Sequence, residues 1–217
     1  RLVLICASMS GDVALSMRRV TAKCCERISR RAFDAAMTRR KKVTAVHKAN
    51  VFRISDGLFL REVRKVAKDF PGVELEEVIV DAMAALLLRD PMRFDVVVAE
   101  NMYGDILSDE ASELSGGLGL GGSINAGDEF CVAQAQHGSA PDIAGRNRAN
   151  PVSLILSAAM LLEWLAARHR VEPLARAARA IDTAVDAALK NAATRTADLG
   201  GTLGTREFAA AVAAALA

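Results

Sequence analysis

Cysteine and histidine are scarce in this chain, and neither occurs in a pattern that binds metal. The 217 residues include four cysteines and three histidines. No two cysteines form a Cys-x-x-Cys pair, and Cys24 and Cys25 are adjacent, too close for an ordinary disulfide. These spacings argue against a zinc site. They are typical of reduced thiols in a cytoplasmic protein, so the cysteines are expected to be free.

The chain also lacks an excess of charge and a long apolar run near its start. A net charge of +2 gives no electrostatic reason to expect nucleic acid or an anionic membrane as a partner. The apolar run Leu2–Ala7 is too short to cross a membrane and is predicted to be a buried strand. Because the sequence opens at Arg1 without a signal-peptide pattern, we expect it to be part of a longer protein. The paired basic residues, Arg18-Arg19, Arg30-Arg31 and residues 39–42, are expected on solvated helix faces.

Strand and helix patterns alternate along the first half of the chain. Strands are predicted at 43–47, 78–80 and 94–99, and helices at 24–37, from 55 to 70, at 82–88 and from about 103. The valine run in 94–99 is expected of a strand buried on both faces. This alternation predicts an α/β fold with a largely parallel sheet flanked by helices.

A glycine-rich stretch, residues 116–122, interrupts this alternation and is a candidate domain boundary. It is followed by a section predicted to be rich in loops, 125–151, and by helices predicted at 153–168, 174–189 and 205–216. No Gly-x-Gly-x-x-Gly follows the first strand, so an ordinary Rossmann site is not supported.

Asp105 and Asp109 form the most informative chemical pattern. They lie four residues apart on a predicted helix, so their carboxylates share one face and repel each other mildly. A cation between them would remove the repulsion, and oxygen-only ligation favours Mg²⁺ or Mn²⁺. Asp81, at the carboxyl end of a predicted strand, is a third candidate ligand. The alternative is that these residues only begin or cap helices, where acidic side chains are common.

Lys48 and a later loop could bind or act on a small molecule. Lys48 directly follows a predicted strand, where it could serve as a base or bind a substrate carboxylate; a solvated lysine is the alternative. The small residues of the loop His137–Gly145 let a ligand approach the backbone closely. Within it, Asp142 could accept hydrogen bonds from ribose hydroxyls and would repel a 2′-phosphate, which favours NAD over NADP. A plain surface loop is the alternative.

Several long motifs, in order, resemble the isocitrate/isopropylmalate dehydrogenase family of β-decarboxylating dehydrogenases. The resemblance runs from about residue 20 to 202. Its main elements are VTAVHKANVFRISDGLF, VIVDAMAALLLRDPMRFDVVVAENMYGDILSDEAS, HGSAPDIAGRNRANP, LILSAAMLLEWL and TADLGGT. The resemblance implies a two-domain isopropylmalate dehydrogenase-like fold without its N-terminal part. Residues 1–114 would form the smaller domain, which binds substrate and dimerises, and 115–217 the C-terminal part of the nucleotide-binding domain.

The resemblance also implies roles for individual residues. Asp105 and Asp109 are expected to bind Mg²⁺ or Mn²⁺ in one subunit of a homodimer, and Asp81 and the catalytic Lys48 to be donated from the other subunit. Asn50 is expected beside the substrate and the nicotinamide. The implied NAD adenosine site consists of His137, Gly138, Ser139, Ala140, Pro141, Asp142, Ile143 and Asn150. The implied reaction is oxidative decarboxylation of a 2-hydroxy dicarboxylic acid such as 3-isopropylmalate, isocitrate or a related malate.

The sequence departs from the family near its start. The family's arginine-rich helix, which grips substrate carboxylates, has no clear counterpart here. Cys6–Ser10 stands where the family usually has Arg-Glu-Asn-Thr-Glu before its catalytic tyrosine, and Tyr103 is the chain's one tyrosine. Gln134 replaces a usual acidic residue before the adenosine loop. The alternative hypothesis is therefore a truncated or non-catalytic member that acts as a dimerising or regulatory subunit.

Overall fold

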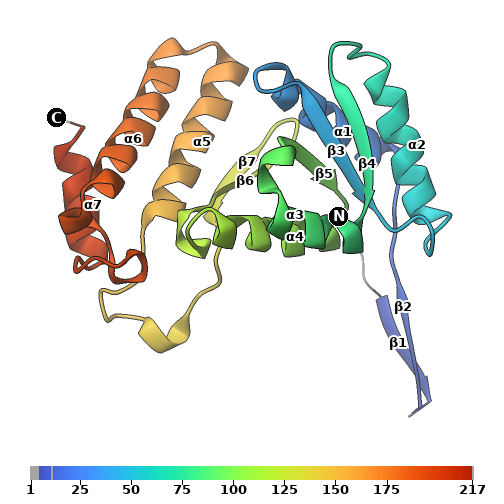
Figure 1. Ribbon diagram of the computed structural model, residues 1–217, viewed down its shortest axis with the longest axis horizontal. Coiled ribbons are helices and arrows are strands. Elements are labelled where there is room, and N and C mark those ends of the chain that lie inside the picture. Colours follow the sequence, from blue (N-terminus) through green and yellow to red (C-terminus); the bar gives the residue numbers. More distant parts are fainter. Residues whose placement is uncertain (1–4, 11, 217) are drawn as a thin grey trace. The chain divides into compact units, whose positions relative to one another are not determined.

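The computed structural model describes residues 5–10 and 12–216 in two compact units (Figure 1). The first unit is Arg1–Ala111 and the second is Ser112–Ala217. The division falls inside helix α4 (Asn101–Leu114), whereas the sequence analysis placed the boundary after Leu114.

The first unit is built on a parallel three-stranded sheet with strand order β4-β3-β5. Strand β3 (Lys42–His47) lies in the centre, with β4 (Glu74–Ile79) and β5 (Val96–Ala99) on either side. Helix α1 (Ala22–Met37) precedes β3, and α2 (Ser55–Ala67) connects β3 to β4. Helix α3 (Val80–Arg89) and a 3₁₀ turn (Pro91–Arg93) connect β4 to β5. The predicted α/β class and parallel sheet are confirmed.

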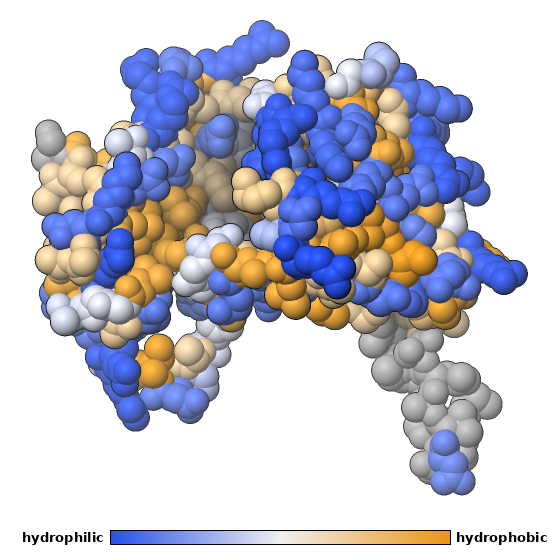
Figure 2. Space-filling view, viewed as in Figure 1, coloured by the Kyte–Doolittle hydropathy of each residue, from blue (hydrophilic) through white to orange (hydrophobic). Residues whose placement is uncertain are grey.

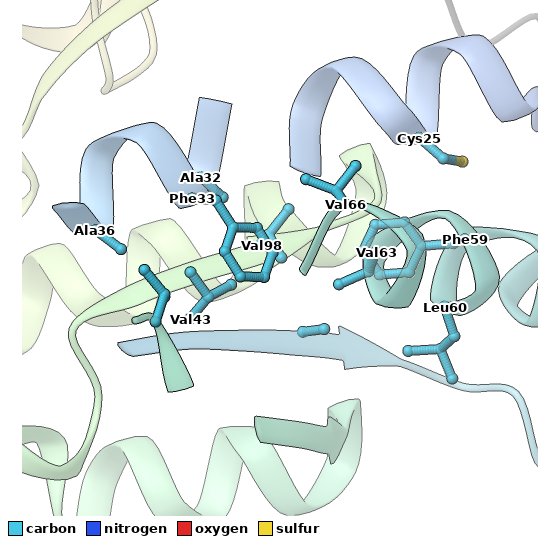
Figure 3. Packing of buried hydrophobic residues seen from close by; sticks show 12 residues of the cluster. Cys25, Ala32, Phe33, Ala36, Val43, Phe59, Leu60, Val63, Val66 and Val98 are labelled. Atoms are coloured by element: carbon cyan, nitrogen blue, oxygen red, sulfur yellow. The ribbon is translucent and has the colours of Figure 1, made fainter. Parts of the chain in front are cut away.

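Helices cover the sheet on both faces, and the alternation of side chains along β3 explains how. Val43 and Ala45 pack with α1 and α2 in one core cluster, whose close packing around Phe33 and Phe59 is seen in Figure 3. Val46 points to the opposite face, where it joins residues of α3 and α4 in a second cluster. All four residues from Val43 to Val46 are fully buried, so β3 is the strand enclosed on both faces.

The prediction that 94–99 is a strand buried on both faces is wrong in part. Val98 is 2% exposed, but Val97 is 38% exposed. Within the described residues β5 pairs with β3 alone, so it is an edge strand with one less-covered face. The strand also begins later than expected, at Val96.

The start of the described chain forms a hairpin. Strand β1 (Ile5–Ser10) pairs antiparallel with β2 (Val13–Met17), and Ile5 lies opposite Met17. The expected single buried strand at Leu2–Ala7 lies partly outside the described residues, and its remainder belongs to this two-stranded sheet.

The second unit is a helical layer with a β-hairpin. After a 3₁₀ turn (Leu118–Leu120), β6 (Gly122–Ala126) and β7 (Cys131–Ala135) pair antiparallel and pack on α5 (Val152–His169). Helix α6 (Glu172–Lys190) packs on α5, and α7 (Thr205–Ala214) packs on α6. Short 3₁₀ turns lie at Pro141–Ile143, Ala192–Thr194 and Ala197–Leu199. The three helices agree with prediction, but the hairpin runs from the end of the glycine-rich stretch into the section predicted to be loops.

Helix α5 is long and apolar enough, by length and composition, to cross a membrane. It packs against β6, β7 and α6. Val152 belongs to the core of the second unit, and the partly buried Ile155 and Leu156 pack against that core. We therefore interpret its apolar character as that of a packed helix.

Candidate active site

Three connections leave the same edge of the parallel sheet and carry the candidate catalytic groups. In the register of the strands, His47 pairs with Ile79, and Val46 pairs with Ala99. Lys48, Asp81 and Glu100 therefore follow the carboxyl ends of β3, β4 and β5 closely. This is the edge at which open α/β sheets bind ligands.

Lys48 and Asp81 form a short ion pair across this edge. The Nζ of Lys48 donates a hydrogen bond to Oδ1 of Asp81, which lies in the first turn of α3. That hydrogen bond lowers the pKa of Asp81. The Lys48 side chain is 25% exposed and that of Asp81 is 66% exposed, so both remain accessible to a ligand. The structure thus brings together two residues that sequence reasoning selected separately.

Helix α4 presents both remaining candidate carboxylates on its outer face. Asp105 and Asp109 are exposed, and so are Met102 and Ile106, which are 47% and 60% exposed. These four positions follow helical spacing and form one stripe. The opposite side of the helix is buried through Leu107, which is 4% exposed.

This donor set suits a hard divalent cation but is incomplete within one chain. Carboxylate oxygens are the ligands that Mg²⁺ and Mn²⁺ prefer. Among the described residues, however, no three His, Cys, Asp or Glu side chains are grouped closely enough to hold a metal. Asp81 is therefore not gathered with Asp105 and Asp109 in a single chain.

Sequence reasoning missed a buried charge cluster beside Lys48. Asp56, at the start of α2, has a fully buried side chain, and Nη2 of Arg18 donates to its Oδ1 at 2.5 Å. Nη1 of Arg18 lies 2.8 Å from Oε2 of Glu100, whose side chain is 8% exposed. The backbone N–H of Lys48 donates to Oδ2 of Asp56 at 2.7 Å.

The prediction that Arg18 lies on a solvated helix face is therefore wrong. Its side chain is only 15% exposed, and it precedes α1 rather than lying on a helix. Its guanidinium also lies over the rings of Phe52 and Tyr103, 4.9 Å and 5.8 Å from their centroids. The sequence signal, a basic pair before a helix, does not reveal such distant partners.

Opposing influences act on the pKa of the acidic groups in this cluster. Burial raises the pKa of Glu100, and the nearby Asp56 carboxylate raises it further, while Arg18 opposes both. Burial also raises the pKa of Tyr103, which is 5% exposed. One arginine thus faces two buried carboxylates, which makes it the cation on which their burial depends.

The loop predicted to bind adenosine encloses a cavity of about 270 Å³ in the second unit. Its lining includes five of the predicted residues: His137, Gly138, Ser139, Ala140 and Ile143. Pro141 and Asp142 lie in the same loop but are exposed outside this lining. Ala140 adopts a left-handed conformation with φ 41°, which helps to turn the loop around the cavity.

Two predicted cofactor residues lie elsewhere. Asn150 is 8% exposed, donates to Oδ2 of Asp198 at 2.9 Å and accepts from the N–H of Val152 at 3.0 Å. It therefore joins the start of α5 to a later turn. Asn50 is exposed in the tight turn after Lys48, in the first unit.

Comparison with known proteins identifies the family of the chain. Residues 4–212 match the model of the isocitrate/isopropylmalate dehydrogenase family. The 3-isopropylmalate dehydrogenase of Sulfurisphaera tokodaii is 45% identical over 200 residues, which cover 92% of this chain and 59% of that protein. The isocitrate/homoisocitrate dehydrogenase of Thermus thermophilus is 48% identical over 206 residues, with coverages of 94% and 59%.

A solved structure extends the likeness to three dimensions. The crystal structure of isocitrate dehydrogenase from Methylococcus capsulatus matches with a TM-score of 0.88 and 42% identity, covering 100% of this chain and 62% of that one. The parallel sheet carries a lysine and carboxylates at its carboxyl edge, which is where α/β proteins bind their ligands. The chain belongs to the isocitrate/isopropylmalate dehydrogenase family, as predicted. It spans 59% of the length of the two curated relatives described above.

Proposed function

We propose that the chain carries part of the active site of an NAD-dependent dehydrogenase that oxidatively decarboxylates a 2-hydroxy dicarboxylic acid. The observation that carries this proposal is the Lys48–Asp81 ion pair at the carboxyl edge of the sheet. It places an ammonium group beside a candidate metal ligand, and both groups are partly exposed. Family membership supports the same reaction class.

Asp105 and Asp109 would hold Mg²⁺ or Mn²⁺, with Asp81 completing the donor set from a second copy of the chain. A metal bound there would polarise the substrate hydroxyl and stabilise negative charge after decarboxylation. The lack of a three-residue donor group within the described part of one chain fits such a shared site.

Lys48 would take part in removing the proton of the C2 hydroxyl. NAD bound to this chain would accept the C2 hydride, so that the substrate would become a ketone. Loss of its β-carboxyl group as CO₂ would leave an enolate that takes up a proton to give the keto-acid product. The cavity lined by His137–Ala140 and Ile143 would hold the adenosine half of NAD. The exposed Asp142, in the same loop, would accept hydrogen bonds from the ribose hydroxyls.

A homodimer would cover the outer stripe of α4. Met102 and Ile106 expose apolar surface on either side of Asp105, and Leu88 on α3 is 63% exposed. Figure 2 shows hydrophobic colour along this part of the first unit. Apolar surface beside carboxylates is expected where a second chain both buries the helix and contributes to the site.

A non-catalytic subunit is the second candidate. The chain's one tyrosine, Tyr103, is 5% exposed and packs beneath Arg18, so it is poorly placed to donate a proton to a substrate. A subunit with this architecture would retain binding and dimerisation without turnover.

NADH formation tests the proposal. The purified chain is assayed at 340 nm with Mn²⁺, NAD and 3-isopropylmalate, isocitrate, homoisocitrate, tartrate or malate, and Asp105→Asn is the control. Metal-dependent turnover with one substrate, lost in the control, is expected. A folded chain that binds Mn²⁺ but does not turn over any of them would favour a truncated or non-catalytic family member.

A further inference from the structure

Asp56 contacts the candidate catalytic lysine through its backbone. Its Oδ2 accepts from the N–H of Lys48 at 2.7 Å, and this is the first residue after β3. Its Oδ1 accepts from Arg18 and lies 3.0 Å from the hydroxyl of Ser55, which donates to it. The carboxylate thus has a partner on each oxygen, as a fully buried charge requires.

The hydrogen bond from the Lys48 N–H to Asp56 helps to fix the backbone position of Lys48. The carbonyl of Lys48 accepts from the N–H groups of Val51 and Phe52, at 2.9 Å and 2.8 Å. The N–H is held by Asp56, so both backbone polar groups of Lys48 are engaged. A residue held on both sides has little freedom in φ and ψ, and its side chain reaches Asp81 from a fixed origin.

Arg18 connects this anchor to the helix that carries the other candidate ligands. Nη2 of Arg18 contacts Asp56, and Nη1 contacts Glu100, the residue immediately before α4. The carbonyl of Glu100 accepts the helical hydrogen bond from Gly104 at 2.8 Å, so the ion pair is attached to the first turn of α4. The guanidinium also lies over the Phe52 ring, 4.9 Å from its centroid, which restricts it further.

We propose that Arg18 and Asp56 are positioning residues that hold Lys48 at the catalytic edge and connect it to the start of α4. This role rests on the function proposed for Lys48, but the contacts themselves do not. A buried ion pair is weak evidence for stability, because its desolvation cost offsets much of its attraction. The second oxygen of the buried Asp56 carboxylate accepts from the Lys48 backbone. A role in fixing the geometry of the neighbouring site explains this arrangement.

The first test measures the reactivity of the Lys48 amine and does not require turnover. The intact chain is treated with a limiting amount of an acetylating reagent, and the acetylation rate at Lys48 is compared with that at Lys23 and Lys65 by peptide mass spectrometry. In Asp56→Ala, Lys48 should react about fivefold faster relative to the two reference lysines, as expected for the loss of one hydrogen bond. In Asp56→Asn the rise should be smaller, because the amide oxygen can still accept from the Lys48 N–H.

Asp69→Asn is the matched control. Asp69 is an acidic residue near the end of α2 that pairs with Arg30 at the surface. Lys48 should react in this variant as in the wild type. An unchanged Lys48 rate in folded Asp56→Ala would overturn the proposal, and so would an equal rise in Asp69→Asn.

A second measurement needs no substitution, so it remains decisive if Asp56→Ala fails to fold. Amide hydrogen exchange in the wild-type chain should be at least about tenfold slower at Lys48 than at the exposed Asn50 after correction for intrinsic rates. Equal exchange at the two amides would overturn the proposal. Failure of the NADH assay would instead count against the proposed function and leave both of these results intact.

Discussion

The ammonium group of Lys48 donates a hydrogen bond to the carboxylate of Asp81, joining the end of β3 to the first turn of α3. The two residues are 33 positions apart in the sequence and meet because their strands are parallel neighbours in register. We therefore expect one chain to supply both residues to the same site.

Replacing Lys48 should affect chemistry more than cofactor binding. In Lys48→Met, the side chain that would take part in removing the proton of the substrate hydroxyl is lost, and kcat should fall about 10²–10⁴-fold. Binding of NAD should be unchanged, because the cavity at residues 137–149 lies in the second unit. Steady-state kinetics and NAD titration test this, and a loss confined to KM would contradict the role given to Lys48.

Asp142 should determine the choice between NAD and NADP. Asp142→Ser removes a charge that would repel a 2′-phosphate and a strong acceptor for the ribose hydroxyls, so NAD affinity should fall about tenfold or more. NADP affinity should rise. Calorimetric titration of both dinucleotides measures the change, with Asp128→Ser, an exposed acidic residue in the β6–β7 turn, as the control. Equal losses for NAD and NADP would refute the assignment.

Acid should weaken a bidentate pair that joins α2 to β4. Arg64 donates to Glu77 through Nε and Nη2, at 2.7 Å and 2.6 Å, and these bonds lower the pKa of Glu77. A carboxyl with a lowered folded pKa stabilises the fold above its ordinary pKa, and this contribution is lost as pH falls through the lowered value. Arg64→Met should therefore cost about 0.5–1 kcal/mol at pH 7.

The difference between wild type and Arg64→Met should shrink below the ordinary glutamate pKa of 4.5 and vanish at lower pH. Urea denaturation at a series of pH values measures it. Lys68→Met, at the exposed end of the same helix, is the control and should show no such pH dependence. A difference that persists at acid pH would show that Arg64 stabilises the fold by packing rather than by its charge.

Ile106 should matter for association rather than for folding. It is 60% exposed on the stripe of α4 that carries Asp105 and Asp109. Ile106→Lys should dissociate a dimer that buries this stripe, while the melting temperature of the first unit changes little. Sedimentation velocity tests this, with Val171→Lys, an exposed apolar residue of the second unit, as the control. An unchanged sedimentation coefficient would place the dimer interface elsewhere.

Sequence patterns within short segments predicted several helices and one strand accurately. Strand β3 and helices α1, α5 and α6 lie within two residues of their predicted bounds. A β-branched run identifies β3, and apolar residues at helical spacing identify α1. The β6–β7 hairpin was missed because its position depends on α5. Buried Ser157 accepts from the N–H of Ser123 at 2.9 Å, and buried Ser153 accepts from the N–H of Gln136 at 3.0 Å.

The sequence predicted those site residues that lie at the ends of predicted strands. Lys48 and Asp81 were selected because each ends a strand, and the family motifs named them as well. Arg18 and Asp56 were not, because they are 38 positions apart and nothing in the sequence near either one identifies the other. A buried ion cluster is a tertiary feature, and only the packing of α2 and the β5–α4 connection around Arg18 reveals it.

Mixing two inactive variants tests the shared site most directly. Lys48→Met retains Asp105 and Asp109, while Asp105→Asn retains Lys48 and Asp81. If sites are shared, each mixed dimer contains one intact site, and random exchange should restore about one quarter of the wild-type activity. Restoration of this size is the result predicted for subunits refolded or exchanged together. With the wild-type chain active and mixed dimers formed, no restoration would contradict a site built from two chains.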